Sequence, residues 1–155
     1  MSRVEERLRG MGLELPEPAP PIANYVAAVR TGNLVFLSGH APRQAGSYVY
    51  LGKVGRELSV DDGYQAARVV MLSALASLKA EIGDLDRVRR VVKLLGMVNS
   101  APDFHDQPAV INGASDLLVE LFGDAGRHAR SAVGMAELPM GISVEIELIV
   151  EVESA

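Results

Sequence analysis

The stretch HARSAVGMAELPMGISVEIELIVEVE, residues 128–153, decides the fold of this chain. From 144 to 152 apolar residues occupy every second position, as in a β-strand whose side chains point alternately to the two faces of a sheet. Glutamates and one isoleucine lie between them, so one face of this strand meets a core and the other faces outward. The segment 130–136 predicts a second strand before the turn LPMG, and we expect Arg130 and the glutamates to lie on neighbouring strands.

Two amphipathic helices precede these strands. The first is predicted to begin after Ser59, which can form a capping box with Asp62, and to end at Gly83. Between these residues apolar side chains recur every three to five positions. The second helix is predicted to begin near Pro108, because proline is favoured in a first helical turn, and to end at Gly123.

The remaining β-rich runs complete a sheet. Two of them flank Thr31-Gly32-Asn33, a sequence typical of a hairpin turn. The order of elements is therefore β-β-(β)-α-β-α-β-β, which predicts an α+β fold: a sheet of five to six strands with two helices packed on one face. The strands predicted in this part are 25–29, 34–38, 48–51 and 88–98.

The N-terminal part differs from the rest in composition. Residues 2–11 predict a short helix capped by Ser2, with Glu5 three positions later. The run LELPEPAPPIANY that follows holds four of the eight prolines and predicts an extended connector. We therefore expect an N-terminal helix and Pro-rich extension over 1–21 and a folded domain over 22–155.

Composition argues against several classes of protein. The 155 residues are 48% hydrophobic and 23% charged, as in a globular domain. The chain has no cysteine and its three histidines lack metal-ligand spacing, so we expect neither a disulfide nor a metal. A net charge of −5 argues against nucleic-acid binding. No apolar run is long enough for a membrane span and no signal peptide is evident, which predicts a cytoplasmic protein.

Two helices can cover only one face of the predicted sheet. Part of the apolar run 35–37, together with Ile149, must then lie on the other face. Further copies of the chain would cover such a face most simply, so we expect self-association.

Several motifs resemble those of one family: PIANYVAAV at 21–29, FLSGHAP at 36–42, VINGASDLL at 110–118 and ARSAVGMAELPMGISVEIELIV at 129–150. Over roughly residues 22–152 the chain resembles the RidA family, also called YjgF/YER057c/UK114, in a longer-chain branch. The resemblance implies a chorismate-mutase-like fold and a homotrimer, with a central barrel of three sheets and three clefts between subunits.

The resemblance also implies a site and a reaction. Arg130 matches the arginine that binds the carboxylate of a small 2-imino acid, a role suited to a planar guanidinium. Glu145 matches the catalytic glutamate that activates water and passes its proton to the leaving nitrogen. The products are a 2-oxo acid and ammonia, and no cofactor is needed. The further substrate-binding positions are Tyr25, which would cover the cleft from a neighbouring subunit, and Ser38, Gly39, His40, Asn112 and Ala132.

Some of these positions have a second interpretation. His40 stands where the family often has an amide, and Ala132 where it commonly has cysteine. Gly39 can mark a strand end that needs an unusual backbone angle. Asn112 and Gly113 can mark an interruption of the second helix near the pocket.

Three functions are therefore compatible with the sequence. The first is hydrolytic deamination of small reactive 2-imino or enamine acids. The second is a non-catalytic trimer that binds a small carboxylate-bearing metabolite as a sensor or carrier. The third, an endoribonuclease, needs basic residues that face phosphate, and the cluster at 87–93 is better interpreted as strand-edge or interface charge.

Overall fold

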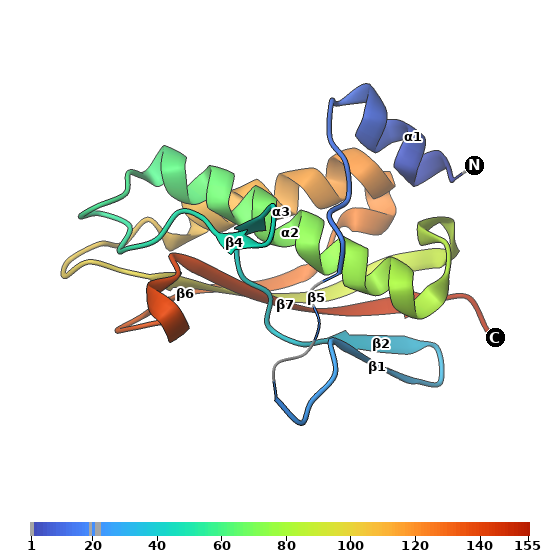
Figure 1. Ribbon diagram of the computed structural model, residues 1–155. Helices are drawn as coiled ribbons and strands as arrows, with labels where there is room; N and C mark the ends of the chain where they lie inside the picture. Colours follow the sequence, from blue (N-terminus) through green and yellow to red (C-terminus); the bar gives the residue numbers. More distant parts are fainter. Residues whose placement is uncertain (1, 19, 21–22) are drawn as a thin grey trace.

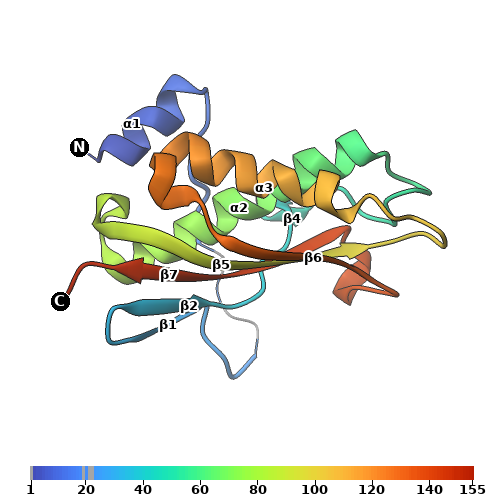
Figure 2. The same cartoon turned by 180° about the vertical axis from the view of Figure 1, so that it is seen from behind.

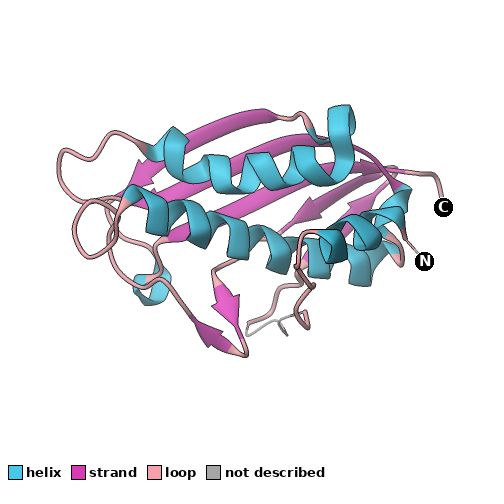
Figure 3. Cartoon of the chain, turned by 90° about the horizontal axis from the view of Figure 1, so that it is seen from above, coloured by secondary structure: helices cyan, strands magenta, loops and turns pink. Residues whose placement is uncertain are grey.

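The computed structural model, which describes residues 2–18, 20 and 23–155, has an α+β fold. Figures 1 and 3 show α2 and α3 lying side by side across one face of a mixed five-stranded sheet. The predicted fold class is thereby confirmed. The elements are α1 (Arg3–Gly10), β1 (Ala28–Thr31), β2 (Leu34–Leu37), β3 (Arg43–Gln44), β4 (Ser47–Tyr48), α2 (Val60–Ile82), β5 (Val88–Asn99), α3 (Gln107–Phe122), β6 (Ala129–Met135) and β7 (Val144–Val152).

Strand β7 lies in the middle of the sheet, whose order is β1-β2-β7-β5-β6. Every second residue from Val144 to Val152 is buried, as the alternation predicted. The prediction that Arg130 and the glutamates lie on neighbouring strands is wrong, because β5 separates β6 from β7. The helix α3 connects β5 to β6, and these two strands pair in parallel. Strand β7 therefore pairs with the other edge of β5. In this position the helices cover the apolar face of β7.

The predicted signals at the ends of α2 are confirmed. Ser59 and Asp62 form the capping box in both directions, at 3.0 and 2.9 Å. Gly83 ends the helix with a φ of 88°, in the left-handed region that favours glycine. Local sequence was sufficient here, because each signal acts on backbone groups within one helical turn.

Gly113 lies at the closest approach between the two long helices. The interpretation of Asn112 and Gly113 as a helix interruption is wrong, since α3 runs through both residues. A Cβ atom at position 113 would lie 2.0 Å from the carbonyl oxygen of Tyr64 on α2. Glycine is therefore required here by the packing of two backbones.

Replacing Gly113 with alanine is expected to lower the free energy of unfolding by about 3 kcal/mol, because the helix backbones must move apart. Chemical denaturation measures this loss. Gly10→Ala is a matched control, since a Cβ there meets nothing within 4 Å. Equal stability of the two variants would contradict this account of the helix packing.

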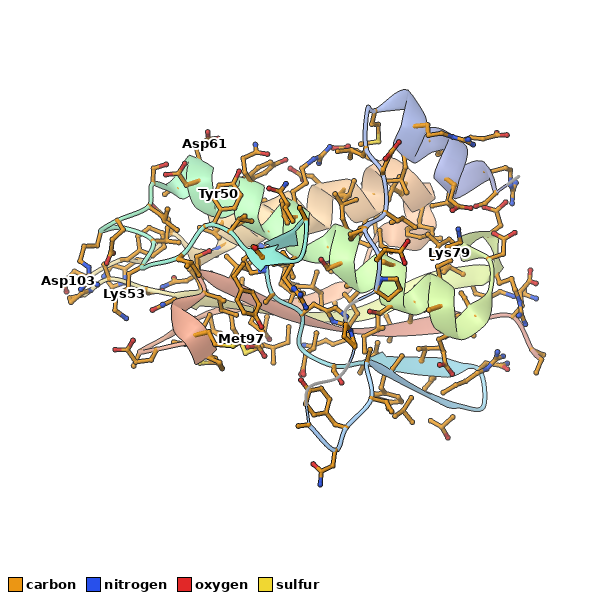
Figure 4. All side chains as sticks on the ribbon, viewed as in Figure 1. Tyr50, Lys53, Asp61, Lys79, Met97 and Asp103 are labelled. Atoms are coloured by element: carbon orange, nitrogen blue, oxygen red, sulfur yellow. The ribbon has the colours of Figure 1, made fainter. Side chains whose placement is uncertain are left out.

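The N-terminal helix α1 is docked on the core by Val4 and Leu8, which are both buried. The Asp86 carboxylate accepts hydrogen bonds from the first turn of α1, among them the backbone N–H of Val4 at 3.0 Å. Burial alone would raise the pKa of Asp86, but these hydrogen bonds bring it down to about 2. Lys79 of α2, labelled in Figure 4, adds an ion pair with Glu5. The helix predicted over 2–11 is thus present, and its first turn is held by hydrogen bonds and an ion pair.

Two of the smaller strands differ from the prediction. The first begins at Ala28, so Tyr25 lies before it. The run 48–51 does not extend the main sheet, because Tyr50 has a φ of 54° and interrupts the extended backbone. Its first residue pairs instead within the separate β3–β4 hairpin. The predicted turn between β1 and β2 is confirmed, and Gly32 takes a φ of 58° there.

The face of the sheet away from the helices carries apolar side chains. Val29, Phe36 and Val133 are 54%, 40% and 39% exposed. Of the run 35–37 only Phe36 points to this face, because its two neighbours are buried under the helices. Met97, labelled in Figure 4, is half-buried on the same side. Among the described helices, none is long and apolar enough to cross a membrane.

Candidate active site

A cavity of about 460 Å³ lies where β2 and β7 separate. The regular pairing of the two strands ends at Phe36, and the chain meets β7 again through a single bridge at His40. Ser38 and Gly39, which lie between these two contacts, border the cavity. Five of the eight predicted site residues line it together in one chain: Tyr25, Ser38, Gly39, His40 and Glu145.

The Glu145 carboxylate lies directly against the backbone of Gly39. A Cβ atom at position 39 would be 2.2 Å from Oε2 of Glu145. The φ of Gly39 is outside the left-handed region, so the interpretation that glycine supplies an unusual backbone angle here is wrong. Position 39 lacks a side chain because the carboxylate occupies that space.

The environment of Glu145 disfavours its ionised form relative to a glutamate in water. Burial raises the pKa of this carboxyl, and the negative charge of Glu147, two residues along β7, raises it further. A carboxyl whose pKa is raised gives up its proton less readily than an ordinary glutamate and returns to the protonated form more easily. These are properties expected of a general acid–base group.

Replacing Gly39 with alanine is expected to lower kcat/KM by about 10- to 100-fold, because the new methyl group displaces the Glu145 carboxylate. Steady-state kinetics measure this loss, with the small 2-imino acid that the sequence resemblance implies as substrate. In a Gly39→Ala/Glu145→Gln double variant the alanine should cost nothing further, since the carboxylate is already absent. Additive losses would show that Gly39 acts in some other way.

His40 borders the cavity, but both of its ring nitrogens are bound by the protein. Nδ1 lies 2.7 Å from the carbonyl oxygen of Ser38, and Nε2 lies 2.8 Å from Oγ of Ser77 on α2. A carbonyl can only accept, so Nδ1 carries the hydrogen of the neutral ring and Nε2 accepts from the serine. Burial lowers the pKa of His40, although the bond to Ser38 opposes this. The ring consequently ties the cavity wall to α2.

Arg130 lies outside this cavity, on the edge strand β6 beneath α3 (Figure 2). Its Nη1 donates to Oδ1 of Asn112 at 2.7 Å and to Oγ of Ser115 at 3.2 Å. Asn112 therefore contacts Arg130. Ala132 lies two residues after Arg130 on β6, so its side chain is on the same face of the sheet. Ser115 was missed from the sequence. The signal was its position three residues after Asn112, which places both on one helical face.

Within one chain, Arg130 and Glu145 cannot bind the same small molecule. Arg130 on β6 is paired with Leu94 on β5, and Leu94 is paired in turn with Leu148 on β7. Position 148 lies three residues after Glu145 on β7. Two inter-strand spacings and three residues of strand separate their Cα atoms by about 14 Å. The side chains also lie on opposite faces, because positions 145 and 148 alternate. Each chain thus presents two separate parts of a site.

The two parts have complementary chemistry. Among the described residues, both hydrogen bonds of Arg130 leave from Nη1, so the Nε–Nη2 edge keeps the geometry for two parallel bonds to a carboxylate. The cavity around Glu145 offers an acid–base group beside Ser38 and Tyr25. No three His, Asp or Glu side chains in the described part of the chain are grouped to hold a metal ion.

Known proteins share this fold and this length. Residues 5–152 match the profile of the family described as "YjgF/chorismate_mutase-like, putative endoribonuclease". Protein TCP17 of Trypanosoma cruzi is 44% identical over 153 residues, covering 98% of this chain and 96% of that protein. The 2-iminobutanoate/2-iminopropanoate deaminase of Dermatophagoides farinae is 32% identical over 141 residues, covering 91% and 95%.

Solved structures agree with these relatives. The crystal structure of Atu1372 from Agrobacterium tumefaciens, a protein of unknown function, has a TM-score of 0.92 at 45% identity and covers 97% of this chain and 93% of that one. The structure of E. coli TdcF with bound serine has a TM-score of 0.61 at 25% identity, covering 91% and 96%. The fold therefore defines a chorismate-mutase-like α+β protein. Within that class, the chain belongs to the YjgF/RidA family.

Proposed function

We propose that the protein is a homotrimeric deaminase that hydrolyses small 2-imino acids to 2-oxo acids and ammonia. The observation that carries the proposal is the division of the site: an acid–base carboxylate in a cavity and an arginine with an open edge on the opposite side of the sheet. In an oligomer, Arg130 of one copy can meet Glu145 of another. The deaminase relative at 32% identity and the serine bound by TdcF support a small amino-acid-like ligand.

The apolar outer face of the sheet supports the oligomer. Val29, Phe36 and Val133 lie on this face and are substantially exposed in the single chain. An exposed apolar face of this kind is stabilised by association with further copies. In a closed trimer built on this face, we expect the edge strand β6 of one copy, which carries Arg130, to lie beside the place where β2 and β7 of the next copy separate around Glu145.

The reaction needs only groups that this chain supplies. Arg130 of one copy binds the substrate carboxylate and leaves the imine carbon facing the Glu145 cavity of the neighbouring copy. Ionised Glu145 takes a proton from a water molecule as its oxygen attacks the carbon of the protonated imine. Glu145 returns that proton to the nitrogen of the resulting carbinolamine. As the C–N bond breaks and the C=O bond forms, the ionised Glu145 carboxylate takes the hydroxyl proton and passes it to the departing ammonia, which leaves as ammonium. Glu145 is then ionised again.

The direct test is hydrolysis of an unstable substrate made in place. An amino-acid oxidase generates 2-iminobutanoate in the assay, and its disappearance is followed with and without the protein. The proposal expects loss well above the rate in buffer, with 2-oxobutanoate and ammonia formed in equal amounts. Buffer-rate decay at saturating protein would exclude the deaminase.

A non-catalytic carboxylate-binding trimer is the second candidate, because Arg130 alone is sufficient to bind an acid. It predicts saturable binding of pyruvate, measured by calorimetry, without acceleration of imine loss. An RNA substrate incubated in parallel tests the endoribonuclease named in the family description, for which we expect no cleavage.

A further inference from the structure

The guanidinium of Arg130 is one end of a chain of hydrogen bonds that runs back into the protein. Its Nη1 donates to Oγ of Ser115, which lies 2.9 Å from Nε2 of His128. Nδ1 of His128 lies 2.7 Å from the carbonyl oxygen of Gly126. Ser115 is on α3, and His128 immediately precedes β6. Neither residue was among the predicted site residues.

The direction of every hydrogen in this chain can be worked out. The Gly126 carbonyl can only accept, so Nδ1 of His128 must carry a hydrogen. Nε2 of the neutral ring then has a lone pair and accepts from the Ser115 hydroxyl. With its hydrogen directed to His128, Ser115 turns oxygen lone pairs toward Arg130. A hydroxyl that donates in one bond is also a better acceptor in the next.

The surroundings favour the neutral form of His128 that this arrangement needs. Burial lowers the pKa of His128, the hydrogen bond to Gly126 opposes this, and the positive charge of Arg130 lowers it again. The histidine is therefore suited to orient the serine without adding a second positive charge beside the arginine.

We infer that Ser115 and His128 are positioning residues of the small-acid site: neutral His128 orients Ser115, and Ser115 holds Nη1 of Arg130 so that the Nε–Nη2 edge faces an incoming carboxylate. The inference rests on the proposed role of Arg130. Asn112 binds the same nitrogen from the same face of α3, so two acceptors fix one rotamer of a long side chain. Binding then loses less side-chain freedom than with a mobile arginine.

The test is pyruvate binding by calorimetry, combined with steady-state imine hydrolysis. Ser115→Ala is expected to weaken binding and raise KM by about 10-fold while kcat stays near the wild-type value, because the arginine holds substrate and transition state alike. Ser115→Thr keeps a hydroxyl and should restore most of the affinity. His128→Leu should resemble Ser115→Ala, whereas His128→Gln keeps an acceptor oxygen and should lose less.

A second measurement does not depend on ligand. Nitrogen-15 NMR of the histidines at neutral pH is expected to show His128 with its hydrogen on Nδ1. A hydrogen on Nε2 of His128 would overturn the inference. The inference would also be overturned if Ser115→Ala bound pyruvate with wild-type affinity while Arg130→Ala had lost binding. If Arg130→Ala itself binds pyruvate like the wild type, the proposed function fails and this inference fails with it.

Discussion

Replacing Arg130 with alanine is expected to lower kcat/KM for 2-iminobutanoate by about 100-fold or more, with a comparable loss of pyruvate affinity. The guanidinium is permanently charged, and its Nε–Nη2 edge can give two parallel hydrogen bonds to one carboxylate. Alanine removes both bonds and the charge. Imine-hydrolysis kinetics and pyruvate calorimetry on the same preparation measure the two losses.

Two variants show what the arginine contributes. Arg130→Lys keeps a positive charge but not the planar pair of donors, so we expect an intermediate loss. Arg127→Ala is the matched control: its side chain is 78% exposed and lies three residues away in sequence, so activity should be unchanged. Similar losses for Arg127→Ala and Arg130→Ala would mean that positive charge in general, rather than Arg130, attracts the substrate.

Replacing Glu145 with glutamine is expected to lower kcat by about 100- to 10,000-fold and to leave KM nearly unchanged. The amide has the size of the carboxyl group and can still lie against Gly39, but it cannot take a proton from water. Single-turnover and steady-state kinetics separate this loss from weaker binding. A variant that retains wild-type kcat would exclude Glu145 as the acid–base group.

The pH dependence gives an independent check on Glu145. The attack on the imine needs the ionised carboxylate, so kcat should fall as the pH drops through the pKa of Glu145, which burial and Glu147 raise above its ordinary value. Glu147→Gln removes the neighbouring negative charge and lowers that pKa. The acid limb of the kcat profile should therefore move to lower pH in Glu147→Gln, with kcat at its plateau unchanged.

Mixing the two inactive variants tests whether copies share the site. A complex co-assembled from Arg130→Ala and Glu145→Gln chains contains interfaces at which the intact Arg130 meets the intact Glu145. Random assembly of equal amounts should restore about a quarter of the wild-type activity. A site within one chain would gain nothing from mixing.

Local patterns predicted most of the fold. The capping box at Ser59, the glycine end of α2 and the turn at Gly32 were found where expected. The alternation from Val144 to Val152 correctly placed the apolar face of β7 under the helices. Each of these features depends on residues within about one turn or one strand pair, so a short window of sequence contains the physical cause.

The errors have a common origin in contacts between distant segments. Gly39 and Gly113 were each given a local conformational role, but space is the reason for both: the Glu145 carboxylate fills one position and the Tyr64 carbonyl the other. Ser115 was overlooked because its partner His128 lies thirteen residues away and across the junction of helix and strand. The spacing of residues along the sequence does not predict a contact such as that between Ser115 and His128.

Residue order alone was sufficient for the fold class, the inward face of β7 and the family motifs around Arg130 and Glu145, because these follow from spacing along the chain. Folding in three dimensions set what spacing cannot encode: β5 lies between β6 and β7 and separates arginine from glutamate, and the pairing register puts their side chains on opposite faces of the sheet. The strand order arises because α3 connects β5 to β6 as parallel neighbours, which leaves the other edge of β5 for β7. That outcome makes a second copy of the chain necessary for the chemistry we propose.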